Sequence, residues 1–335
     1  DNCLTCEDTG ELLTLDTKVA CGVEGVVLKP TDPNGFVVIA PQGDGFLAVD
    51  CPTPGSAEGG NCRGVNAVDL QISRNTATQV ASGNYSVISG GKNNSALGTY
   101  TTVAGGYNNV AGGSGTGAFV GGGRYNVATG TNSVVVAGYG NRATGNESFI
   151  GGGYINLITG TGTNSVVVGG VNNRVSSEFS FIGGGVRNVV TGSYSTVCGG
   201  FSNYILDNCS CIVSGDGNVI NKSLGQYGDS FIGGGRGNRV FDDCDVSFIG
   251  GGQTNIITAS SIFSTIVGGI SNKAAGSVSF IGGGAYNLAG NLNQNATAVG
   301  ITANGSACVI SGGFANQATG SYSAIIGTLP WSSSL

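Results

Sequence analysis

A short segment recurs along this chain: Ser-Phe-Ile-Gly-Gly-Gly occurs five times, and each copy reaches an asparagine eight residues after its serine. When the chain is aligned on that asparagine, taken as position 9 of the unit, fourteen copies share Ile or Val at position 3, Gly at position 6 and Ala, Val or Ile at position 11. Eleven of the fourteen have Ser at position 1. Such regularity is typical of a repeat protein, in which each unit packs only against its neighbours.

The copies are mostly 15 residues apart, sometimes 17, and at two places 20 and 29. All extra residues fall between one asparagine and the next serine, so one corner of the unit tolerates insertions. Fifteen residues are enough for two short strands and two turns, but too few for a helical repeat. We therefore predict an all-β fold, a parallel β-solenoid or β-roll of about fifteen 15–17-residue coils, with strands at positions 1–4 and 9–12. Glycines at positions 5 and 6 should form one turn, and the glycine at position 13 should open the other.

The asparagine at position 9 should form a ladder of stacked amides along the solenoid, as in other stacked-strand structures. The first seven members of this predicted ladder are Asn94, Asn109, Asn126, Asn141, Asn156, Asn173 and Asn188.

Both faces of the first strand are apolar. Side chains alternate along a strand, so position 3 can fill the interior while positions 2 and 4 face outward. Position 2 carries six phenylalanines: Phe119, Phe149, Phe181, Phe231, Phe248 and Phe280. Every phenylalanine copy has Gly at position 4, and no other copy does. This pairing of large with small indicates constant volume at a packed seam, so we predict a homo-oligomer, most simply a homotrimer; a dimer also fits, and the alternative is a monomer whose loops cover this face.

The unit S-x-[IV]-x-G-G-x-x-N-x-A-x-G, as in Ser133 to Gly145, resembles the head repeats of trimeric autotransporter adhesins, which are trimeric parallel β-rolls. The segment from Gly59 to Gly91 looks like the start of such repeats in fibre proteins of bacteriophages and giant viruses. The resemblance covers residues 59–327 and departs from the adhesins in having one more residue per unit and no coiled-coil stalk or membrane anchor. It implies a virion or appendage fibre.

The ends differ from the repeats in composition. Residues 1–58 are acidic and carry apolar runs at Gly35–Ala40 and Gly45–Val49, which read as a β-hairpin of a small docking or capping domain. Residues 59–85 lead into the repeats at 86–327, and residues 328–335, with the only Trp, form a C-terminal cap.

Composition argues against several functions. The net charge is −6 and no basic stripe is present, so nucleic acid is not an expected partner. No apolar run is long enough to span a membrane. The chain has no His, which removes the common acid-base and triad schemes, so we expect no enzyme activity and no cofactor.

Three kinds of modification or ligand site remain open. Asp242, Asp243 and Asp245 are weak candidates for a calcium site, with a solvated loop as the alternative. Asn146, Asn208 and Asn295 lie in sequons at the variable corner and could carry glycans. Disulfide candidates are Cys3, Cys6, Cys21, Cys51 and Cys62 near the N-terminus, Cys198 with Cys211 on neighbouring coils, and Cys209 with Cys244.

Ten Cys and a polar surface favour an oxidising, extracellular or virion-surface location. The function we expect is that of a structural fibre or spike subunit whose partners are copies of itself. The alternative is an adhesin that binds host-surface glycans or proteins. An ice-binding solenoid is disfavoured, because position 1 is Ser and position 2 is apolar instead of a Thr-x-Thr rank.

Overall fold

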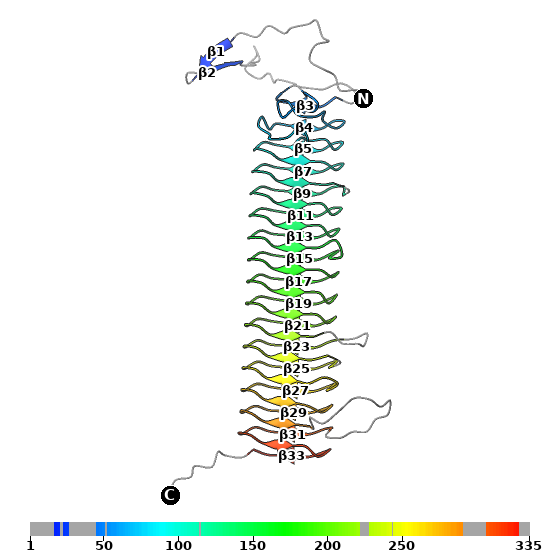
Figure 1. Cartoon of the computed structure of the whole chain (residues 1–335), viewed down its shortest axis with the longest axis vertical. Helices are drawn as coiled ribbons and strands as arrows, with labels where there is room; N and C mark the ends of the chain where they lie inside the picture. Colours follow the sequence, from blue (N-terminus) through cyan, green and yellow to red (C-terminus); the bar gives the residue numbers. More distant parts are fainter. Residues whose placement is uncertain are drawn as a thin grey trace, which may run out of the picture.

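The repeat winds the chain into a stack of short turns that rise along one axis (Figure 1). The computed structural model describes residues 17–20, 23–26, 45–50, 52–113, 115–221, 228–242, 244–290 and 306–327. These residues form an all-β parallel solenoid of about 16 turns, and they contain no helix. The predicted solenoid is confirmed.

Strands at positions 2 and 3 of successive coils make a parallel ladder of 17 strands. Its register places each position over the same position of the next coil, as in Val134 over Phe149. The strands are β3 (Leu47–Ala48), β4 (Val68–Asp69), β5 (Val87–Ile88), β7 (Thr102–Val103), β9 (Phe119–Val120), β11 (Val134–Val135), β13 (Phe149–Ile150), β15 (Val166–Val167), β17 (Phe181–Ile182), β19 (Thr196–Val197), β21 (Cys211–Ile212), β23 (Phe231–Ile232), β25 (Phe248–Ile249), β27 (Thr265–Ile266), β29 (Phe280–Ile281), β31 (Val309–Ile310) and β33 (Ala324–Ile325).

Strands at positions 10 and 11 make a second parallel ladder of 14 strands. They are β6 (Ser95–Ala96), β8 (Val110–Ala111), β10 (Val127–Ala128), β12 (Arg142–Ala143), β14 (Leu157–Ile158), β16 (Arg174–Val175), β18 (Val189–Val190), β20 (Tyr204–Ile205), β22 (Val219–Ile220), β24 (Arg239–Val240), β26 (Ile256–Ile257), β28 (Lys273–Ala274), β30 (Leu288–Ala289) and β32 (Gln317–Ala318).

The strands are shorter than the four residues predicted. Each spans two residues, because the corners begin at position 5 and leave little extended chain. The N–H of position 4 still donates to the coil below, as Gly151 does to the Val167 carbonyl at 3.0 Å. A third line of contacts follows position 7, where single parallel bridges join coils, such as Tyr139 to Tyr154.

In each coil the interior is filled by one inward side chain from each of the two strands. Positions 3 and 11 are fully buried, and Ile150 with Ile158 is a typical pair in one coil. Burying such a side chain stabilises the fold by about 1.5–3 kcal/mol. Serine at position 1 is also buried, and its hydroxyl donates to a nearby carbonyl in most coils. Ser148 donates to Gly145 in its own corner at 2.6 Å, and Ser195 donates to Asp207 of the next coil at 2.8 Å. The core is thus apolar in the middle and hydrogen-bonded at its rim.

The asparagine ladder runs the length of the solenoid, and its bonds go mainly to the backbone. The Asn141 Oδ1 accepts the backbone N–H of Asn156 at 2.9 Å. The Nδ2 of Asn156 donates to the Gly152 and Gly170 carbonyls, each at 2.9 Å. Direct amide-to-amide bonds also occur, such as Asn173 Nδ2 to Asn156 Oδ1 at 3.2 Å. The side chain therefore satisfies backbone groups that the corner would otherwise leave unpaired in a buried place.

The second glycine of the corner is required by geometry. At position 6 the φ of Gly153 is 93°, and a Cβ there would overlap the Gly170 carbonyl oxygen and lie 2.7 Å from Asn156 Nδ2. At position 5 the requirement differs between coils. A Cβ on Gly122 would meet nothing within 4 Å, and Ala137 occupies that position in another coil, whereas Gly152 has a φ of 159° that side-chain residues rarely adopt.

The corners also place ordinary side chains in the left-handed region. The residue before position 1 and the residue at position 8 have φ near 54° in one coil, at Glu147 and Ile155. This conformation costs a non-glycine residue roughly 1–2 kcal/mol. It persists because the hydrogen bonds to the coils on either side fix the path of the chain at both corners.

The N-terminal region follows the prediction only in part. β1 (Thr17–Ala20) and β2 (Val23–Val26) form an antiparallel pair. The run at Gly45–Val49, predicted as half of a hairpin, instead supplies β3, which pairs in parallel with β4. Residues 35–40, its predicted partner, and the cap at 328–335 lie outside the described residues.

Among the residues that the structure describes, no helix is long and apolar enough to cross a membrane.

Candidate assembly surface

The outward side chains of positions 2 and 4 form one continuous strip along the solenoid, here called the aromatic face. Phe149, Phe248 and Phe280 remain 36–39% exposed, and Val168 at position 4 is 48% exposed. No residue at positions 2 and 4 is charged in any coil from Val87 to Ile326. A strip of this length that is uncharged and mostly apolar, with Thr or Ser in a few coils, is unusual for a surface in contact with water.

The pairing of phenylalanine with glycine has its cause inside one chain. In the coil of Phe149 the ring lies over position 4, and a Cβ on Gly151 would be 3.4 Å from the ring carbon Cε1 and would overlap the Val168 carbonyl oxygen. The coil of Phe181 is the same, with Gly183 at 3.2 Å from the ring. The sequence interpretation attributed this pairing to a seam between chains. The contacts within one chain are enough to explain it.

Coils with phenylalanine mostly alternate with coils that carry smaller side chains at position 2. Val134 lies between Phe119 and Phe149 in the ladder. Where two phenylalanine coils are adjacent, the rings of Phe231 and Phe248 stack with centroids 5.3 Å apart and planes at 4°. The aromatic face is thus ordered by contacts between neighbouring coils, with its outer side left uncovered in the single chain.

The outward side chains of positions 10 and 12 form the opposite strip, here called the mixed face. Arg142, Arg174 and Arg239 are exposed at position 10, and Lys273 is half-buried. No acidic residue shares positions 10 and 12. Threonine is common at position 12, where Thr144 donates to the Ile158 carbonyl at 3.0 Å. This face therefore carries charged side chains, which the aromatic face lacks.

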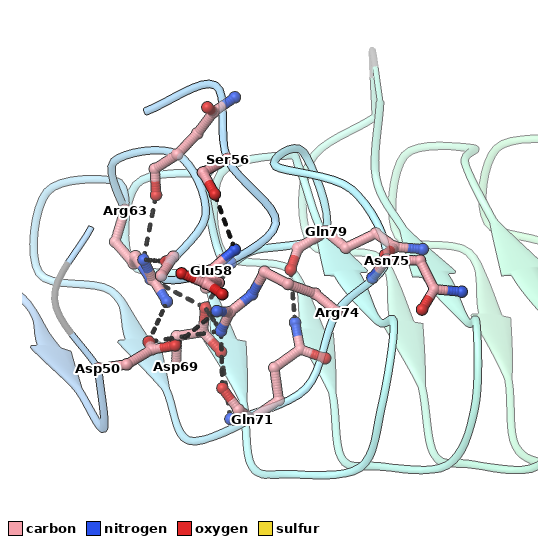
Figure 2. A network of polar contacts seen from close by, with 12 residues as sticks. Asp50, Ser56, Glu58, Arg63, Asp69, Gln71, Arg74, Asn75 and Gln79 are labelled. Carbon is pink, nitrogen blue, oxygen red and sulfur yellow. Dashed lines mark hydrogen bonds and ion pairs between the residues drawn. The ribbon is translucent and has the colours of Figure 1, made fainter. Parts of the chain in front are cut away.

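A buried network of charged groups closes the N-terminal end of the core (Figure 2). Asp69 takes position 3 in the register, directly above Ile88, and is fully buried. Its Oδ2 accepts from Arg63 Nε at 2.9 Å, and Arg74 lies 4.0 Å away. Both arginines also pair with Asp50, at 2.8 and 2.5 Å. Ion pairs therefore occupy the position that carries Ile or Val in the repeat coils, and Ala48 of β3 lies opposite Asp69 on the other side.

Burial raises the pKa of Asp69 above its usual value of 3.8, and the Arg63 charge, with hydrogen bonds from the backbone, offsets part of that rise. Beside it, Gln71 takes the place of the ladder asparagine. Its Oε1 accepts the N–H of Asn94 at 2.9 Å, and its Nε2 donates to the Asn94 carbonyl at 2.8 Å. The coil of β4 thus ends both the row of buried Ile and Val side chains and the amide ladder with paired polar groups.

Sequence analysis did not identify this network. The signal was present in Ala67 to Ile72, where Asp69 and Gln71 alternate with apolar residues and take the inward positions of a strand. An acidic residue at an inward position needs a buried cation, which Arg63 and Arg74 provide.

The cysteine predictions have mixed outcomes. Cys62 is disulfide-bonded, whereas Cys3, Cys6, Cys21 and Cys51 lie outside the described residues. Cys198 and Cys211 are free thiols on the aromatic face of adjacent coils. Cys211 lies opposite Thr196 in the register, so it is diagonal to Cys198. The two thiols are close enough to form a hydrogen bond, but they are not joined as a disulfide.

Cys209 and Cys244 do not form the predicted pair. Cys209 is exposed at a corner, whereas Cys244 is buried and its Sγ donates to the Thr258 carbonyl at 2.6 Å.

The other candidate sites give little support for ligand chemistry. In the described part of the chain, no group of three His, Cys, Asp or Glu side chains is placed to hold a metal ion. Asp242 and Asp245 belong to that part, whereas Asp243 lies outside it. The calcium site stays a prediction.

The sequons at Asn146 and Asn208 are exposed at the variable corner, and their Oδ1 atoms accept the backbone N–H of Thr131 and Ser193, each at 2.9 Å. Asn295 lies outside the described residues. Glycosylation at these positions remains a prediction.

No family model matches the chain, and no curated protein matches it.

Proposed function

We propose that this chain is the structural subunit of an extracellular or virion-surface fibre, in which copies associate through the aromatic face. The observation that carries the proposal is the absence of any charge at positions 2 and 4 over the whole length of the solenoid, together with phenylalanines that stay more than a third exposed in a single chain. Covering each of these side chains removes apolar area from water, worth about 25 cal/mol per Å².

The role is mechanical and not catalytic. Successive coils exchange backbone hydrogen bonds at three lines, and every coil adds inward aliphatic side chains to one core. About 16 turns at about 4.8 Å each give a rod of roughly 75 Å. Because hydrogen bonds and core contacts repeat along the axis, bending or local unfolding must break several of them at once. A stiff rod that extends from a surface is what this arrangement supports.

Three copies around one axis are the simplest closed assembly. Three strips, each along one edge of its rod, can converge on a threefold axis and exclude water from all six phenylalanines. Closed cyclic symmetry also avoids leaving an apolar strip free for further growth. The mixed face, with its three exposed arginines, then remains in solvent.

The test is the mass of the full chain in solution, measured by light scattering and native mass spectrometry, with and without reductant. We expect three chains of 33.1 kDa each, with reductant leaving the mass unchanged if the apolar face alone holds the assembly. A mass of two chains would support assembly, but as a dimer instead of a trimer. A single chain at micromolar concentration would overturn the proposal.

A further inference from the structure

One edge of the solenoid carries four tyrosines in four successive coils, here called the tyrosine ridge: Tyr107, Tyr125, Tyr139 and Tyr154. They occupy positions 7 and 8, at the corner between the two ladders, away from both the aromatic face and the variable corner. Consecutive ring centroids are 5.5, 5.4 and 5.2 Å apart. Tyr125, Tyr139 and Tyr154 are 41–48% exposed. The ridge is therefore a continuous aromatic surface parallel to the axis.

The ridge is held rigidly by its backbone. Parallel bridges connect position 7 of these coils in the order Tyr107, Arg124, Tyr139 and Tyr154. Each tyrosine also rests on the ring of the next, so few rotamers remain to be lost when a ligand binds. Preorganised tyrosines of this kind give large contact areas at a small cost in conformational entropy.

The rings are oriented so that both faces and edges are presented. Tyr125 meets Tyr107 at 85° and Tyr139 at 65°, and in such an edge-on pair only one ring has a face covered by its neighbour. Tyr139 and Tyr154 are nearly parallel, at 15°, so that their hydroxyl-bearing edges line up along the axis. A hydrogen bond between the hydroxyls of Tyr107 and Tyr125 raises the pKa of Tyr125 above its ordinary 10.0. The ridge thus offers apolar ring faces beside neutral hydroxyl groups.

The charge on the ridge is small. Its one cation is Arg124, and that guanidinium lies over the Tyr107 ring at 5.8 Å from the centroid. Lys92 lies at position 7 of the coil before Tyr107 and adds one charge at that end. The ridge contains no carboxylate. A polyanion would need several cations along this edge, so nucleic acid and sulfated glycans fit poorly.

We propose that the tyrosine ridge is a binding site for an extended, neutral, β-linked polysaccharide that lies along the rod. The separation of the rings is close to the length of one pyranose residue in such a chain, so that successive sugars would meet successive tyrosines. Sugar C–H groups would pack against the Tyr125 ring and the edges of the stacked Tyr139 and Tyr154 rings, and sugar hydroxyls would exchange hydrogen bonds with the phenols. Four coils supply contacts to about four sugars. This site does not depend on assembly through the aromatic face.

The proposal is tested with the full chain by affinity electrophoresis in native gels that contain hydroxyethyl cellulose, xylan or galactomannan. Dextran serves as a neutral polymer that is not extended, and heparin as an acidic one. We expect retardation by at least one of the three β-linked polymers and none by dextran. No retardation by any of the three would overturn the proposal, as would retardation by heparin alone.

The variant Y125A/Y139A/Y154A should lose at least tenfold in affinity for the retarding polymer. The matched control is Y194A/Y286A, because Tyr194 and Tyr286 are each 58% exposed and lie off the ridge. The control should bind as the natural chain does. Equal binding by the ridge variant, or equal loss in both variants, would contradict the assignment. The mass of the ridge variant in solution should equal that of the natural chain, so a failure of assembly and a failure of sugar binding are measured separately.

Discussion

The aromatic face and the mixed face are built by the same repeat, yet they differ in one respect that decides their environment. Both present the outward side chains of two-residue strands, with the same register and the same spacing. On the mixed face Arg142, Arg174 and Arg239 interrupt the apolar side chains of position 10. On the aromatic face no charge occurs. The fold tolerates charge on an outward strand, so its absence from one face supports the proposal that this face packs against another chain.

The largest effect should come from introducing charge at one level of each face. In the coil of β13 and β14, Phe149→Asp places a carboxylate on the aromatic face and Leu157→Asp places one on the mixed face. If the aromatic face is buried between chains, the first variant must bury an unpaired charge and should dissociate to single chains. The second variant should keep the natural mass. Light scattering at equal concentration measures both.

If Leu157→Asp dissociated the assembly and Phe149→Asp did not, the chains would associate through the mixed face instead of the aromatic face.

A smaller effect should follow from filling the glycine beneath a phenylalanine ring. Gly151→Val has to displace both the Phe149 ring and the Val168 carbonyl, so we expect a loss of about 3 kcal/mol in the free energy of unfolding in urea. The double variant Phe149→Val/Gly151→Val reproduces the pattern of Val134 and Val136 and should recover part of that loss. A double-mutant cycle gives a coupling above about 1 kcal/mol.

The matched cycle on the mixed face uses Leu157→Val and Thr159→Val, where we expect a coupling below about 0.5 kcal/mol. Equal coupling on both faces would mean that the phenylalanine ring does not account for the glycine.

Salt should have still less effect. Since the aromatic face carries no charge, the mass of the assembly should not change between about 0.05 and 1 M salt, where the screening length falls to about 3 Å. Arg174→Gln on the mixed face should alter the free energy of unfolding by less than about 0.5 kcal/mol, because the side chain is exposed. Dissociation at high salt would show that ion pairs, and not apolar contacts, join the chains.

The smallest effect concerns pH. The titratable groups of the aromatic face are the thiols of Cys198 and Cys211, and burial raises the pKa of Cys211 above its ordinary 9.0. A thiol whose pKa is raised by folding contributes stability that is present below pH 9.0 and is lost as the pH rises through the raised pKa. Unfolding in urea between pH 6 and 10.5 should show this loss at the alkaline end, and Cys211→Val should remove it. An identical alkaline loss in the variant would assign it to another group.

Several features of the fold were accessible from sequence because they depend on chemistry that repeats. Ile150 and Ile158 could be predicted to point inward because successive side chains of a strand alternate between its two faces. The amide ladder follows from an invariant asparagine at a constant distance from the glycine corner. Single residues that occur once were not accessible in this way. Asp69 and Gln71 replace the repeat residues only near the N-terminal end of the solenoid, so the repeat pattern could not predict their roles.

The sequence by itself determined that the chain is a β-solenoid, where each coil begins, and which side chains point inward, since a fixed repeat length leaves one register in which every coil stacks on the next. Only the tertiary structure decided which corner glycine is indispensable, because that depends on the carbonyl of the following coil. It also decided that phenylalanine and glycine are paired within one chain, and that ion pairs among Asp50, Arg63, Asp69 and Arg74 close the N-terminal end. These outcomes depend on distances between atoms in different coils, and residue order does not contain such distances.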